Sequence, residues 1–91
     1  MITLEIAREW LRIDGTANDA IISGLLNAAP AYIEMATGAT QLEQETLPLA
    51  DTVTKFLLTL WYNAEQSEAE RLQRTIDNLL KALTVQARGE T

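Results

Sequence analysis

The most apolar segment of the chain, residues 47–65, has hydrophobic positions at the spacing of an α-helix. Placed at about 100° per residue, these positions share one side of the helix: Leu49, Val53, Phe56, Leu57, Leu60 and Ala64. Pro48 suits the first helical turn, because its missing N–H would have no partner there. Lys55 interrupts the run, which is far shorter than the roughly 20 apolar residues of a membrane span. We therefore expect a buried central helix over residues 48–65 and no membrane contact.

Two apolar residues of this segment lie outside the stripe. Leu58 and Tyr62 follow each other at the spacing of one helical turn, on the opposite side, beside Asp51 and Lys55. In a monomer that side should face water. Since exposed apolar patches often mark interfaces, the pattern predicts that Leu58 and Tyr62 contact another subunit.

The pattern predicts a first helix over residues 4–13, with Thr3 as its N-cap and Glu5 in the favourable first turn. Its apolar side is about 180° wide, which is broader than one neighbouring helix covers. Trp10 lies on this side. It is either a core residue or an aromatic anchor in an interface.

A second helix is predicted over residues 17–37, between Gly15 and Gly38, which can adopt positive φ at its two ends. Pro30 stands inside it and removes the hydrogen bond to the Leu26 carbonyl. An uncompensated proline there costs about 3 kcal/mol and kinks the helix. We expect one bent helix, with a break near residue 29 as the alternative.

Residues 38–47 form the longest connector and show neither helical nor strand periodicity. Loops of this length in compact domains are often functional. The segment is either a solvated linker or a partner-binding loop, and in the second case Leu42, Glu43 and Glu45 are its candidate contacts.

A last helix is predicted over residues 68–87, with Ser67 as N-cap and Glu70 completing a capping box. The pattern contains no credible strand. The expected fold is therefore all-α: a single domain over residues 1–91, built as a small bundle of four helices with a long loop between the second and third.

Composition removes most catalytic chemistry. The 91 residues include no cysteine and no histidine, so the commonest general base and the commonest metal ligands are missing. Glu43 and Glu45 have no positioned partner for acid–base work. We expect no enzymatic activity, no cofactor and no bound metal. No signal peptide is visible, since Glu5 precedes any basic cluster, and the cytoplasm is the expected compartment.

The charge of the chain and its apolar surface both indicate which kinds of partner it can bind. The net charge is −6, and no basic residue occurs between Arg12 and Lys55. Phosphate binding needs a basic patch, so direct nucleic-acid binding is not expected. The apolar flank around Trp10, together with Leu58 and Tyr62, exceeds what a small bundle needs and favours a homo-oligomer. The alternative is that the second helix covers both patches.

Several motifs occur together in a recognisable order along nearly the whole chain. They occupy residues 3–14, 25–29, 32–34, 37–38, 48–63 (with its Leu-rich run) and 79–80. In this order they resemble the small head–tail connector (adaptor) proteins of tailed bacteriophages, often labelled DNA-packaging proteins. Two positions depart from the family pattern: Pro30 replaces a helix former, and Ala64 replaces a frequent arginine.

The resemblance implies a structural virion protein at the head–tail junction, assembled in the host cytoplasm. Members form a ring under the portal protein, line part of the DNA channel and carry the next connector or tail-completion protein. On this basis Trp10, Leu58 and Tyr62 are expected subunit contacts, and the loop over residues 38–47 is expected to meet a neighbour or the portal. The alternative is a small acidic helical regulatory module that binds a basic protein. A terminase-like DNA-binding subunit would need a cation cluster that the sequence does not indicate.

Overall fold

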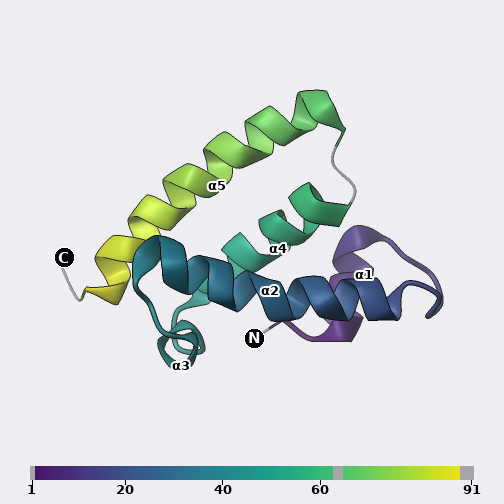
Figure 1. Ribbon diagram of the computed structural model, residues 1–91, viewed down its shortest axis with the longest axis horizontal. Coiled ribbons are helices and arrows are strands. Elements are labelled where there is room, and N and C mark those ends of the chain that lie inside the picture. The colour runs from purple at the N-terminus through teal and green to yellow at the C-terminus, as the bar shows by residue number, and fades with distance from the viewer. Residues whose placement is uncertain (1, 63–64, 89–91) are drawn as a thin grey trace.

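The computed structural model describes residues 2–62 and 65–88, and within these ranges it contains five helices and no strand (Figure 1). They are α1 (Leu4–Leu11), α2 (Asp19–Thr37), α3 (Gln41–Gln44), α4 (Pro48–Tyr62) and α5 (Gln66–Ala87). The all-α class is confirmed. The predicted count of four is wrong, because the long connector contains the short helix α3.

Helix α4 lies at the centre and contacts each of the other four helices. Figure 1 shows α5 along one edge of the molecule, with α1 near one end of α2 and α3 near the other. The main cluster joins α2, α4 and α5, and its buried members are Ala29, Ile33, Ala50, Val53, Leu57, Ile76, Leu80 and Leu83. The predicted stripes of α4 and α5 therefore form the core, as periodicity indicates.

A second, small cluster contains only three buried residues: Ala7, Ile22 and Leu58. Here the expectation for Leu58 is wrong, since its side chain is fully buried. The buried arc of α4 extends from Leu57 round to Leu58 because α1 and α2 together cover that side. Leu58 is thus a core residue of this chain and is not exposed to a neighbouring subunit.

Helix α1 begins as predicted and ends earlier than predicted. The Thr3 hydroxyl accepts a hydrogen bond from the Ile6 N–H at 3.2 Å, which confirms the N-cap. Arg12 adopts a left-handed conformation with φ 58°, and its backbone N–H turns back to the Arg8 and Glu9 carbonyls. The helix therefore stops at Leu11, two residues short of the expected end.

Helix α2 begins at Asp19, later than the predicted residue 17, and continues without a break to Thr37. The alternative of a break near residue 29 is wrong, since Pro30 lies inside one helix. Gly38 ends the helix with φ 81°, and its N–H donates to the Glu34 carbonyl at 2.8 Å.

The boundary between α4 and α5 also differs from the prediction. Residues 63–64, including Ala64 of the expected stripe, lie outside the described ranges. Glu65 is extended, with ψ 158°, and is the N-cap of α5, so α4 does not reach residue 65. Helix α5 begins at Gln66, which puts Ser67 in its first turn and makes the predicted serine N-cap wrong.

Candidate interaction surfaces

The connector between α2 and α4 is fastened to the bundle. The Thr40 hydroxyl accepts from the Glu43 N–H at 3.2 Å, and a Glu43 carboxylate oxygen accepts from the Thr40 N–H at 3.1 Å. These reciprocal bonds form a capping box that starts α3. Buried Gln44 then donates through Nε2 to the Pro30 carbonyl at 2.9 Å and to the Ala39 carbonyl at 3.0 Å.

This anchoring presents the three candidate contacts of the connector from a fixed position. The two interpretations of the segment, a solvated linker and a partner-binding loop, both stay predictions. Leu42 is 75% exposed, and Glu43 and Glu45 are also exposed. Glu43 already has a structural role in the capping box. The signal for α3 was in the sequence, because Thr40 and Glu43 have the spacing of a capping box.

Trp10 combines features of the two predicted roles, a core residue and an aromatic anchor in an interface. Its indole N–H donates to the Thr59 hydroxyl at 2.7 Å, and its ring meets the Phe56 ring edge-on at 6.0 Å. The Lys55 ammonium lies 5.5 Å from the ring centroid, within cation–π range. Trp10 is nevertheless 41% exposed. It is packed against α4 on one side and open to a partner on the other.

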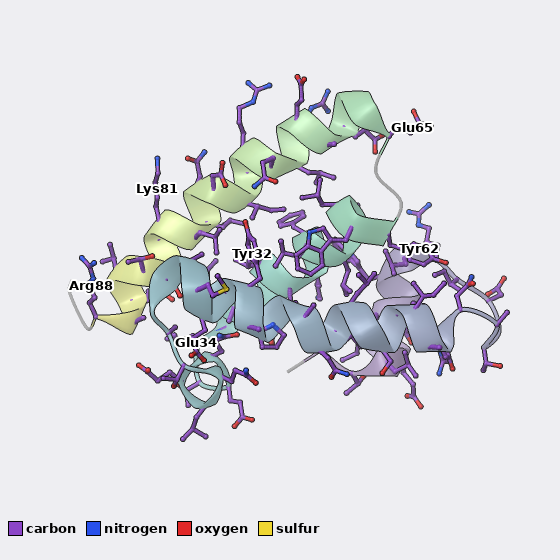
Figure 2. The ribbon with its side chains drawn as sticks, in the orientation of Figure 1. Tyr32, Glu34, Tyr62, Glu65, Lys81 and Arg88 are labelled. Carbon is purple, nitrogen blue, oxygen red and sulfur yellow. The ribbon has the colours of Figure 1, made fainter. Side chains whose placement is uncertain are left out.

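Tyr62 and Leu58, which were predicted as a pair of subunit contacts, differ in how far they are exposed to solvent. Tyr62 is half-buried and packs against the small cluster, at the end of α4 next to α1 (Figure 2). Leu58 is fully buried beneath it. Of the predicted pair, only Tyr62 keeps a surface that a neighbour could touch.

Other large apolar residues are exposed without having been predicted as contacts. Met35 is 89% exposed on α2, Ile21 is 59% exposed near its start, and Val85 is 44% exposed on α5. Trp61 is 37% exposed and meets the Tyr32 ring edge-on at 5.6 Å. A helical wheel could have found Met35 and Val85, because both lie away from the buried stripes.

A groove of about 410 Å³ lies between the N-terminal segment, α2, α3 and the start of α4. Its walls are mixed, with apolar, amide, hydroxyl and carboxylate groups and no lysine or arginine: Ile2, Ser23, Leu26, Asn27, Pro30, Gln41, Leu42, Gln44, Glu45, Ala50, Asp51 and Thr54. The groove is therefore acidic and half apolar. We call it the α2–α4 groove.

Four cations lie on the outer side of α5. Arg71, Arg74, Lys81 and Arg88 are all exposed and recur at three-, seven- and seven-residue steps, which keeps them on one outer stripe. The exposed acids Glu70 and Asp77 lie on the same side, so only the last part of the stripe, from Lys81 to Arg88, is purely basic. Figure 2 shows Lys81 pointing away from the body of the molecule. In the described ranges the ion pair is between Arg8 and Asp19, at 3.1 Å, and none involves these four cations. We call this surface the α5 stripe.

Metal ligation and membrane insertion are the remaining kinds of site to consider. Residues 2–62 and 65–88 contain no group of three His, Cys, Asp or Glu side chains that could hold a metal ion. No helix within those ranges has the length and apolarity needed to cross a membrane. The candidate sites are the surfaces described above.

The described residues form a small all-helical protein, and its candidate sites lie on its surface. The family described as phage gp6-like head-tail connector protein matches residues 1–87, and the chain belongs to this family. No curated protein and no solved structure matches it. Membership assigns a structural connector role in a phage particle.

Proposed function

We propose that the chain is a connector subunit that closes into a homo-oligomeric ring under the portal protein. The ring forms part of the channel for DNA and the platform for the next connector or tail-completion protein. The match of the connector family to residues 1–87 is the observation that carries this proposal, because it spans all helices of the fold. The protein acts by assembly and not by catalysis, without a cofactor and without sequence-specific binding of nucleic acid.

Two kinds of surface support assembly. Trp10 and Tyr62 present partly exposed aromatic rings at the α1 end of the molecule, and aromatic residues are favoured anchors in interfaces. At the other end, Leu42, Glu43 and Glu45 stand on the anchored connector, where they can meet a neighbouring subunit or the portal. Leu58 has no part in these contacts.

Light scattering over a concentration series, with negative-stain imaging of the largest species, tests the proposal. We expect a ring, formed either by the chain alone or after a portal complex is added. A chain that stays monomeric and does not co-migrate with the portal would overturn the connector role. A stable small dimer that binds a basic protein would then favour the regulatory module.

Replacing Tyr62 with glutamate should block ring formation while the protein stays helical, because the charge would be desolvated in the subunit contact. Tyr62→Phe is the matched control and should assemble normally. Circular dichroism checks helicity in both variants. Unchanged assembly of Tyr62→Glu would remove this residue from the interface.

A further inference from the structure

The α2–α4 groove is rich in hydrogen-bond acceptors. Pro30 has no N–H, so the Leu26 carbonyl lacks its helical donor, and both residues line the groove. Gln44, which is 7% exposed, uses its amide nitrogen on the Pro30 and Ala39 carbonyls, which leaves Oε1 as an acceptor. The exposed carboxylate of Glu45 adds negative charge, whereas Asp51, which also lines the groove, already has a partner.

This chemistry selects a cationic occupant with a small apolar side chain. Ammonium and guanidinium groups carry donors only, and they pair best with carboxylates and carbonyl oxygens. Between the polar groups, Leu26, Leu42 and Ala50 offer apolar walls that a short branched side chain could cover. An anionic or wholly apolar ligand would leave the Leu26 carbonyl, Gln44 Oε1 and the Glu45 carboxylate without partners, which is costly on burial.

The chain itself carries a surface of this kind. Lys81, Val85 and Arg88 stand at i, i+4 and i+7 on the α5 stripe, the spacing with which an amphipathic helix enters a groove. Val85 is 44% exposed, and neither cation is ion-paired to a residue in the described ranges. An exposed valine between two cations that have no ion pair within the described ranges is complementary to apolar walls beside the Glu45 carboxylate.

The two surfaces face in different directions. Figure 2 shows Lys81 on the outer side of α5, pointing away from α2, whereas α3, which borders the groove, lies on the other side of α2 (Figure 1). A subunit can therefore use its stripe on one neighbour and its groove on the other. Such a head-to-tail contact closes into a ring when the rotation per subunit allows it.

We propose that the α5 stripe of one subunit docks into the α2–α4 groove of the next copy. Val85 packs between Leu26 and Leu42, and Lys81 and Arg88 meet the acidic rim that includes Glu45. This contact rests on the proposed ring, and it specifies which two faces of the subunit join. It also accounts for a stripe of cations in a chain with a net charge of −6.

A charge swap tests the contact. Lys81→Glu with Arg88→Glu makes the Val85 end of the stripe acidic like the groove, whereas Glu45→Lys with Gln41→Lys makes the groove basic like that end of the stripe. Each double variant alone should raise the concentration needed for assembly by at least about tenfold, as expected for lost complementary charges. An equimolar mixture should restore assembly, because stripes and grooves of opposite charge then alternate.

Arg71→Glu with Arg74→Glu is the matched control. It changes the charge by the same amount on the same stripe, away from Val85, and should assemble as the wild type does. A mixture of the two swapped variants that stays unassembled, while the wild type forms rings, would overturn the contact and leave the ring standing. If the stripe binds DNA instead, Lys81→Glu with Arg88→Glu would lose DNA binding and keep assembly, which also overturns it.

Cysteine cross-linking gives a second measurement that does not depend on a stable ring. The chain has no cysteine, so Leu42→Cys with Val85→Cys places the only two thiols on the two proposed faces. Oxidation should give a ladder of linked species, and Met35→Cys with Val85→Cys should not. No ladder overturns the contact. Wild-type mass, alone and with the portal, then shows whether the ring has failed as well.

Discussion

The main cluster and the small cluster show how differently two ends of one bundle are held. In the main cluster, α4 packs between the nineteen residues of α2 and the twenty-two of α5. The small cluster depends on α1, an eight-residue helix with one buried side chain, Ala7. Short helices are marginal without tertiary support. The comparison indicates that α1 is the part of the fold most easily detached.

Polar contacts compensate at the edge of the small cluster. The Arg8 guanidinium pairs with the Asp19 carboxylate at 3.1 Å, and Trp10 donates to Thr59. Both side chains of the ion pair are 27% exposed, so solvent weakens their attraction. Burial of the apolar side chains of the small cluster, Leu58 and Ala7 among them, therefore stabilises the contact between α1 and α4 more than the ion pair does.

Leu57→Ala should have the largest effect, because this side chain is fully buried in the main cluster. A leucine-to-alanine change in a core costs about 2–5 kcal/mol, and here it removes contacts shared by several helices. Urea unfolding followed by circular dichroism measures the loss. Met35→Ala, at an 89% exposed position, should change stability by less than about 0.5 kcal/mol.

Leu58→Ala should cost about 2–3 kcal/mol, near the lower end of the same range, because fewer buried residues surround it. Amide hydrogen exchange should rise first in α1 and remain slow in α5. Equal acceleration in both helices would show that the two clusters unfold as one cooperative unit. That result would mean that α1 detaches no more easily than α5 does.

Gln44→Ala should cost about 1–3 kcal/mol, because it leaves the Pro30 and Ala39 carbonyls without the donor they now share. Unfolding in urea measures the change. Gln41→Ala, an exposed neighbour on the same short helix, is the control and should have little effect. A Gln44→Ala protein as stable as the wild type would mean that α3 is held by its capping box alone.

Trp10→Phe should have the smallest effect, about 0.5–1.5 kcal/mol, which is the usual worth of one hydrogen bond. Thr59→Val removes the same bond from the other side. If the hydrogen bond to Thr59 accounts for the lost stability, the double variant should have the same free energy of unfolding as the less stable of the two single variants. Additive losses would indicate that ring packing on Phe56 dominates.

The sequence specified the main cluster well, because long periodic stripes in α4 and α5 leave little choice of buried face. It failed at Leu58 for a physical reason: a wheel shows which sides of a helix are apolar, and it does not show which neighbour covers each side. A partner as short as α1 was sufficient to bury Leu58.

The surfaces were harder to predict than the core. The basic and acidic residues of the last quarter balance when counted along the chain. The helix places the cations on one stripe together with Glu70 and Asp77, and only the part from Lys81 to Arg88 is purely basic. Helix α3, with four residues, is too short to show a period. The left-handed Arg12 that ends α1 has no sequence signal, since arginine is uncommon at positive φ.

The placement of the two tryptophans has an optical consequence. Trp10 rests on Phe56 and Thr59 beside the small cluster, whereas Trp61 meets Tyr32 of α2. The fluorescence of each indole is therefore sensitive to a different contact: Trp10 to that between α1 and α4, and Trp61 to that between α4 and α2. With Trp61 changed to phenylalanine, the fluorescence emission of Trp10 reports only whether α1 is packed against α4. With Trp10 changed instead, Trp61 reports the junction of α2 and α4, so fluorescence distinguishes partial detachment from complete unfolding.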